Sequence, residues 1–225
     1  MRKRFFLFLV ESLIFLGVIS CSFSQKDNKS ILGFQNQFFS DNTEKNEIQK
    51  LSSKDYLNWY NETREILSIK IDTLGYNFKL DYRPSEMEAI KLSDSDQDLD
   101  SLFALKSNYY YFLLTTSATQ ANSMETLSNF AKGNEMNFYM QKAFRLVSDG
   151  DSVLCSQFVP IRETLSVDGS ISFFLAFEKK QFKSSDLFKA KLLYHDLYLT
   201  GNLYTMKFND PIYQQLPHLI INKKL

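Results

Sequence analysis

Apolar residues occupy every second position in residues 67–71 and again in residues 76–82. A period of two places all these side chains on one face of a β-strand. The link between the two segments contains Gly75, a residue type that accommodates tight turns. The pattern therefore predicts a β-hairpin with one buried face and one solvated face.

Six further segments are predicted as strands from alternation or from runs of aromatic and β-branched residues. Residues 109–116 are apolar or β-branched throughout, which is typical of a central strand covered on both sides. Asp149-Gly150-Asp151 separates two apolar runs, and Asp-Gly in such a place favours a hairpin turn. The predicted strands are residues 109–116, 143–148, 152–159, 170–177, 188–194 and 203–208.

Helical spacing appears in only a few short segments. Tyr56, Trp59 and Tyr60 stand at i, i+3 and i+4, so they share one side of a helix that begins near Ser53 and that Ser52 or Ser53 can cap. Two more helices and one helical turn are predicted at residues 86–92 with Ser85 as the cap, at residues 122–131, and at Asp210-Pro211. Eight strands and three short helices favour an antiparallel β-sandwich-like domain of the mainly β or α+β class.

The beginning of the chain has the pattern of an export signal. Residues 1–4 form a short basic region with Arg2, Lys3 and Arg4, and residues 5–19 are almost wholly apolar. This stretch ends in Val18-Ile19-Ser20-Cys21. A cysteine directly after Val-Ile-Ser resembles the lipobox of bacterial lipoproteins. That resemblance implies diacylglycerol on the thiol of Cys21, cleavage before Cys21, and fatty acylation of the new amino terminus. Several acyl chains together give stable membrane anchoring.

Two other interpretations of this segment stay open. An uncleaved membrane anchor is disfavoured because residues 5–19 are shorter than the roughly 20 residues that a span requires. Glu11 would also be costly inside a bilayer. An ordinary secretory cut is the second alternative, and in both of them Cys21 would carry no lipid.

Charge and cysteine content agree with an anchored, non-disulfide protein. Removal of residues 1–20 leaves 23 basic and 25 acidic residues, so no excess of positive charge favours nucleic acid as a partner. With Cys21 lipidated, Cys155 has no partner for a disulfide and is expected to be a small buried side chain. We therefore expect a signal peptide at 1–20, a lipidated cysteine and polar tether at 21–52, and one globular domain at 53–225.

Three segments within residues 53–208 follow each other in an order shared with a known group of proteins. They are Phe78–Glu86, Asp149–Cys155 and Phe173–Glu178. In this order they resemble an uncharacterised family of exported lipoproteins of Bacteroidetes-type bacteria. Members of that family carry Lys before the proline, where this chain has Arg83. The resemblance implies a lipoprotein with a single domain, and it brings no activity and no site residue.

The sequence offers no motif of a common enzyme class. It has no Gly-rich phosphate loop, no His-based metal spacing and no Gly-x-Ser-x-Gly elbow, so we predict no catalytic residue, metal site or cofactor. Residues 93–101 begin like a calcium loop, but Leu99 and Leu105 stand where Gly and Glu are needed. We expect a solvated acidic loop there, with a weak calcium site at residues 94–100 as the alternative.

These features together predict a lipid-anchored cell-envelope protein with a binding or scaffolding role, whose partners are the membrane and another envelope protein. Residues 22–29 carry two Lys and one Asp, which favours the periplasmic face of the outer membrane over surface exposure. The alternative is binding of a glycan-type ligand on the aromatic residues Trp59, Tyr109 and Tyr111. A hydrolase is the third possibility, because pairs of carboxylates form in space rather than in sequence.

Overall fold

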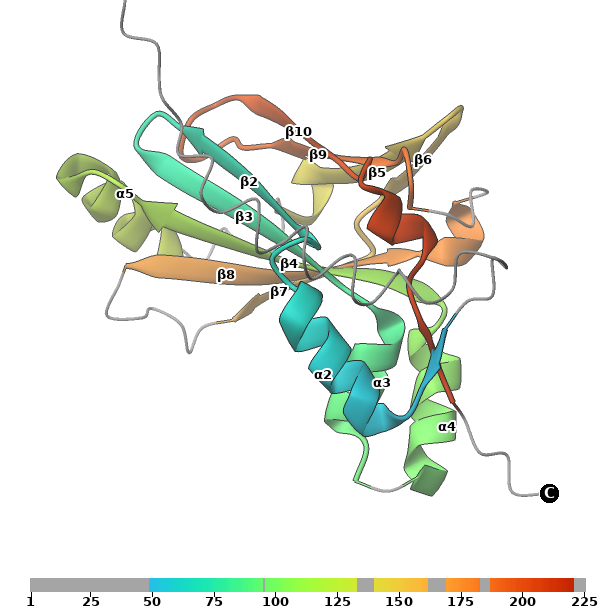
Figure 1. The fold of residues 1–225 in the computed structure, drawn as a ribbon. Helices are drawn as coiled ribbons and strands as arrows, with labels where there is room; N and C mark the ends of the chain where they lie inside the picture. Colours follow the sequence, from blue (N-terminus) through green and yellow to red (C-terminus); the bar gives the residue numbers. More distant parts are fainter. Residues whose placement is uncertain (1–48, 95, 133–139, 162–168, 183–186, 221–225) are drawn as a thin grey trace, which may run out of the picture. The chain divides into compact units, whose positions relative to one another are not determined.

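Two antiparallel sheets form the folded unit, whose described residues lie between positions 49 and 220 (Figure 1). The computed structural model describes residues 49–94, 96–132, 140–161, 169–182 and 187–220. The five-stranded sheet has the order β2 (Ser68–Thr73), β3 (Tyr76–Arg83), β4 (Tyr109–Ala118), β8 (Ser170–Glu178) and β7 (Gln157–Ile161). The four-stranded sheet has the order β10 (Leu203–Lys207), β9 (Lys191–His195), β5 (Phe144–Ser148) and β6 (Asp151–Leu154).

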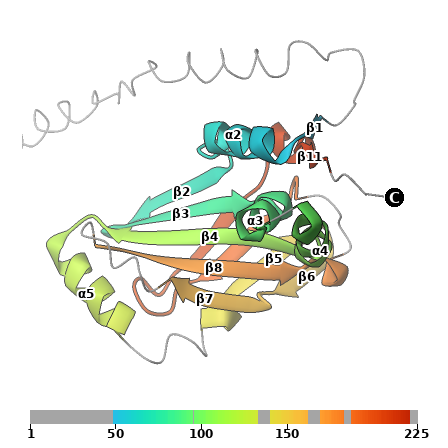
Figure 2. The ribbon, with the colours of Figure 1, turned by 90° about the horizontal axis from the view of Figure 1, so that it is seen from below.

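Short elements surround the two sheets. β1 (Lys50–Leu51) and β11 (His218–Leu219) form a small parallel pair. The α-helices are α2 (Ser53–Thr63), α3 (Ser85–Leu92), α4 (Asp96–Lys106) and α5 (Ala121–Lys132), and the 3-10 turns are η2 (Met140–Ala143), η4 (Lys179–Gln181) and η5 (Pro211–Gln214). Figure 2 shows α3 and α4 at one end of the five-stranded sheet and α5 at the other. None of the helices in the described ranges is long and apolar enough to cross a membrane.

The core lies between the inner faces of the two sheets and is built largely of aromatic rings. Phe78 of β3 lies 5.7 Å from Tyr194 of β9, and the ring of Phe112 in β4 stacks on Phe208 at 5.3 Å. Aromatic pairs at these distances add to the stabilisation that comes from the buried area itself. The predicted fold class, a mainly β or α+β domain built from antiparallel sheets, is confirmed.

The predicted hairpin is β2–β3, with Ile69 opposite Leu80 on the inner face. Leu74 and Gly75 both have positive φ, 46° and 83°, which is the conformation that a two-residue turn between twisted strands requires. Gly75 is also close to α5, because an added Cβ would clash with Ser123 Oγ. The predicted central strand is likewise confirmed as β4, the middle strand of five.

The first predicted helix is α2, and Ser52 caps it by accepting a hydrogen bond from the backbone N–H of Asp55 at 3.3 Å. The predicted cap of the next helix was wrong. Ser85 lies inside α3, the N-cap position is occupied by Pro84, and no side chain caps this end. The hydroxyl of Ser85 donates instead to the carboxylate of Glu86.

Two other predictions are corrected by the structure. The acidic segment 93–101, predicted as a loop, is mostly helical, because α4 begins at Asp96. The predicted strand 152–159 is interrupted at Cys155 and Ser156, so that β6 and β7 belong to different sheets. The backbone N–H of Cys155 donates to Phe144, while that of Ser156 donates to Ala176 of the other sheet. The chain therefore passes from one sheet to the other between these residues.

The number and limits of the elements also differ from prediction. The described residues form eleven strands and four α-helices, against eight and three expected. β9 begins at Lys191 rather than at 188, because Lys189 has a φ of 70° that no regular strand accommodates. Lys50 and Leu51, which the sequence places in the tether, form β1.

Candidate functional site

A pocket of about 260 Å³ lies at the end of the five-stranded sheet where α3 begins. Its walls come from the end of β3, the start of β4, and the segments η4, η5 and β11. Antiparallel pairing brings these strand ends together, since Tyr109 of β4 is opposite Glu178, the residue before η4. The lining residues are Tyr82, Ser85, Glu86, Tyr110, Lys179, Leu187, Tyr213, Gln214, Leu216, Pro217 and His218.

The acidic side of the pocket is Glu86, in the first turn of α3. The side chain of Glu86 is 14% exposed and accepts a hydrogen bond from Ser85 Oγ at 3.0 Å. On the other side, Nδ1 of His218 lies 3.8 Å from Glu86 Oε1. Glu86 is therefore the acidic group of the pocket, and it lies in the first turn of α3.

The basic side of the pocket is Lys179, the first residue of η4. Its backbone N–H donates to the carbonyl of Asn108 at 2.8 Å, which fixes the turn beside β4. Its Nζ lies 4.9 Å from the centroid of the Tyr110 ring, within range of a cation–π contact. Burial lowers the pKa of Lys179, and the charge of Glu86 partly offsets this effect. A half-buried ammonium group therefore lies on the pocket wall across from a carboxylate.

Tyr213 of η5 forms part of the aromatic wall. Asp210 caps η5 and Pro211 is its first residue, as the sequence predicts. The ring of Tyr213 packs edge-on against Tyr82 at 5.9 Å. Its hydroxyl is buried and, within the part of the chain that the structure describes, has no hydrogen-bond partner. Burial raises the pKa of this phenol, so the hydroxyl stays protonated and can donate.

The contacts of Ser85 and His218 described above both go to Glu86, and no hydrogen bond joins Ser85 to His218 among the described residues. The Ser–His–acid order of a hydrolase triad is thus not formed. No cluster of three His, Cys, Asp or Glu residues suited to a metal is found in the described ranges either.

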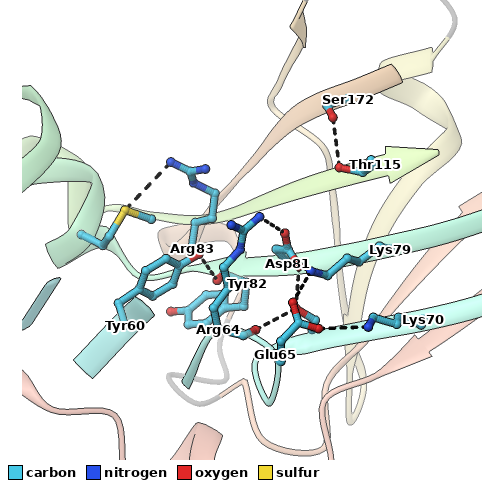
Figure 3. A network of polar contacts seen from close by, with 12 residues as sticks. Tyr60, Arg64, Glu65, Lys70, Lys79, Asp81, Tyr82, Arg83, Thr115 and Ser172 are labelled. Carbon is cyan, nitrogen blue, oxygen red and sulfur yellow. Dashed lines mark hydrogen bonds and ion pairs between the residues drawn. The ribbon is translucent and has the colours of Figure 1, made fainter. Parts of the chain in front are cut away.

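A second polar cluster lies on the outer face of the same sheet (Figure 3). Asp81 is 1% exposed and its carboxylate accepts hydrogen bonds from Arg64 Nη2 at 3.0 Å and from Ser68 Oγ at 2.5 Å. Lys79 Nζ lies 3.3 Å from the same carboxylate. The buried charge is thus balanced within the cluster, so we assign it a structural role that joins the end of α2 to the hairpin.

The residues singled out in the sequence do not form this site. Val18-Ile19-Ser20-Cys21 lies outside the described residues. Trp59 is buried at 4% exposure and packs on Tyr56, while Tyr111 is also 4% exposed and stacks on Phe174. Tyr109 is half-buried and lies 5.9 Å from Tyr111. None of these three aromatic residues lines the pocket.

The residue between them, Tyr110, is the one that lines the pocket, because neighbouring residues of a strand point to opposite faces. The sequence patterns do not predict a ligand-binding role for the other polar and aromatic residues of the pocket, Glu86, Lys179, Tyr213 and His218. These residues come from four separate segments. Only two of the segments have a recognisable sequence pattern, which are the acidic first turn of α3 and the Asp210-Pro211 turn, and both patterns predict secondary structure rather than a binding site.

Known proteins supply no further guide to this site. No protein-family model, no curated protein and no solved structure matches the chain. The function has to be inferred from the chemistry of the pocket and from the pattern of the first 21 residues.

Proposed function

We propose that the chain is an exported protein, anchored by lipid at Cys21 in the cell envelope, whose folded unit binds a small polar ligand of the glycan type. The lipobox-like Val18-Ile19-Ser20-Cys21 supports the anchor. The pocket between Glu86 and Lys179 supports the binding role, and it is the observation that carries the proposal.

The size of the pocket limits the ligand. Pockets for drug-sized molecules measure roughly 300–1,000 Å³, so about 260 Å³ suits a molecule of about one sugar ring. Tyrosine rings offer an apolar surface with a hydroxyl at its edge, a combination that suits the faces and hydroxyls of a sugar. The ammonium group of Lys179 favours a ligand with a carboxylate, such as a uronic acid, over a neutral hexose.

The anchor is tested by growing the natural host with a labelled fatty acid. The wild-type chain is expected to become labelled, and the Cys21→Ser variant is expected to remain unlabelled. An unlabelled wild-type chain would refute the anchor and would leave the binding role to be judged separately.

The binding role is tested by calorimetric titration of the purified protein with glucuronate and with glucose. Glucuronate is expected to bind more tightly than glucose. Lys179→Gln is expected to weaken the binding of glucuronate about tenfold, as loss of one charge-assisted hydrogen bond would, and so to remove the preference for glucuronate. Lys180→Gln is the matched control, because Lys180 is the next residue and its side chain is 80% exposed. If neither sugar binds, or if both lysine variants behave alike, the glycan assignment fails.

A further inference from the structure

Among the described residues, the outer face of the four-stranded sheet carries basic, apolar and hydroxyl side chains and no acidic one. Alternate residues of β5, β6, β9 and β10 are buried in the core, and those between them point outward. We call the outward set the basic face: Arg145, Val147, Ser152, Leu154, Lys191, Leu193, His195, Leu203, Thr205 and Lys207. All of these residues are exposed or half-buried.

Among the described residues, no carboxylate forms an ion pair with Arg145, Lys191 or Lys207 of the basic face. Lys191 and Lys207 are directly opposite each other in the β9–β10 ladder, an arrangement that destabilises an antiparallel pair. Neither lysine has an ion pair with a carboxylate in the described ranges. Arg145 donates to Ser152 Oγ at 2.7 Å, so its charge is not neutralised by that contact.

The lysines on the outer face of the other sheet, in contrast, are paired with a carboxylate. On the β2–β3 hairpin, Lys70 and Lys79 both form ion pairs with Glu65, at 2.9 and 2.7 Å. The processed chain has slightly more acidic than basic residues, so a face with only basic groups means that charge is segregated within the fold. Such a face attracts an anionic partner and repels a cationic one.

Exposed leucines lie among these cations. Leu203 is 62% exposed and Leu154 is 47% exposed, and Leu193 is half-buried between them in the middle of the sheet. Surfaces that combine Lys or Arg with exposed Leu are typical of proteins that lie in the interface of an anionic bilayer. A purely polyanionic partner would use the cations but would leave the leucines in water.

We propose that the basic face contacts the surface of an anionic phospholipid bilayer. The proposal rests on the proposed function only in that the lipid anchor at Cys21 would keep the folded unit close to such a surface. The lysine and arginine groups would lie at the level of the headgroup phosphates, and the leucine side chains would enter the boundary of the acyl chains.

The experiment measures how fast a membrane-impermeant maleimide reacts with Thr205→Cys, in the middle of β10 between Leu203 and Lys207 of the basic face. The chain is placed on vesicles of phosphatidylcholine alone and on vesicles that also contain phosphatidylglycerol. Contact with the anionic bilayer is expected to slow labelling several-fold on the second kind of vesicle only. High salt is expected to restore the rate, since exposed charges are screened beyond about 10 Å at 0.1 M.

Two variants make the result specific. Lys191→Gln/Lys207→Gln is expected to weaken the association about fivefold for each lysine. Lys54→Gln/Lys180→Gln changes the net charge equally at exposed positions outside the basic face and is expected to leave the association unchanged. Asn61→Cys, on the exposed side of α2, is the control for labelling and should react at the same rate on both vesicles.

Equal labelling of Thr205→Cys on both kinds of vesicle would overturn the proposal. Protection by soluble heparin but not by phosphatidylglycerol would also overturn it and would indicate a polyanionic glycan as partner. Vesicles can be added to a chain that lacks lipid, so this rate comparison remains valid even if the fatty-acid experiment shows that Cys21 is not acylated.

Discussion

Arg64, at the end of α2, donates a hydrogen bond from Nη2 to the buried carboxylate of Asp81 in β3, at a distance of 3.0 Å. The two residues differ sharply in burial, since the side chain of Arg64 is 48% exposed and that of Asp81 only 2%. The contact fixes the helix end to the hairpin. It also means that the carboxylate depends on its partners, while the guanidinium can be solvated without them.

Asp81→Asn is expected to lower the free energy of unfolding by about 2 kcal/mol, because hydrogen bonds to a charged group are replaced by neutral ones. Urea unfolding measures this change. Glu62→Gln, on the exposed side of the same helix, is the matched control and is expected to stay within about 0.5 kcal/mol of wild type. Equal effects of the two variants would contradict the structural role of the cluster.

Glu65 is expected to give the stability of the protein a dependence on acid pH. Hydrogen bonds from Lys79 and Lys70 lower the pKa of its carboxyl from 4.5 to about 2. Because the folded pKa is the lower one, this stabilisation is complete above pH 4.5 and is lost as the pH falls towards 2. The side chain is 64% exposed, so the effect should not exceed about 1 kcal/mol.

The measurement for Glu65 is urea unfolding of wild type and Glu65→Gln at a series of pH values. The difference between the two proteins should be greatest near neutral pH and should disappear towards pH 2. A difference that stays constant over this range would show that the ion pairs with Lys70 and Lys79 do not contribute.

Two buried tyrosines are expected to respond oppositely to loss of the hydroxyl group. Tyr56 is 0% exposed and its hydroxyl has no hydrogen-bond partner among the described residues, so Tyr56→Phe should raise stability by about 1 kcal/mol. Tyr60 donates to the carbonyl of Tyr82 at 3.4 Å, a long bond, so Tyr60→Phe should lower stability by about 0.5 kcal/mol. Thermal unfolding of both variants tests this pair, and a destabilised Tyr56→Phe would show that the hydroxyl is satisfied in solution.

Cys155 is expected to be unreactive in the folded protein. Burial raises the pKa of its thiol to about 12, and the thiol donates to the carbonyl of Gln157 at 3.0 Å. Only about one thiol in ten thousand is then ionised at pH 8. Iodoacetamide should modify the Cys155 peptide at an appreciable rate only in urea concentrations that unfold the protein. Rapid modification in native buffer, measured by mass spectrometry, would contradict the burial of this residue.

Local patterns in the sequence predict the elements of this fold well where one local rule decides the outcome. The β2–β3 hairpin follows from strict alternation around Gly75, and α2 follows from its aromatic side and the cap at Ser52. The break at Cys155 and Ser156 could not be predicted in this way. The apolar pattern continues across it, and only the hydrogen bonds to two different sheets separate β6 from β7.

The pocket could not be predicted for a related reason. Glu86 and His218 are far apart in the sequence, and they lie close together only in the folded chain, where β11 pairs with β1. The sequence makes Trp59 and Tyr111 candidates for contact with a ligand, but in the structure both rings are buried and pack against other side chains. A strand alternates its faces, so Tyr110 rather than its neighbours reaches the pocket.

The parallel pair β1–β11 also has a mechanical consequence. It consists of two residue pairs, and the backbone N–H groups of His218 and Ile220 donate to the carbonyls of Gln49 and Leu51, each at 2.8 Å. Tension applied through the N-terminal segment reaches this short pair before it reaches either large sheet. His218 belongs both to β11 and to the pocket wall, so pulling β1 away would release one side of the pocket while the aromatic core stayed folded. A ligand bound in the pocket would resist that pull.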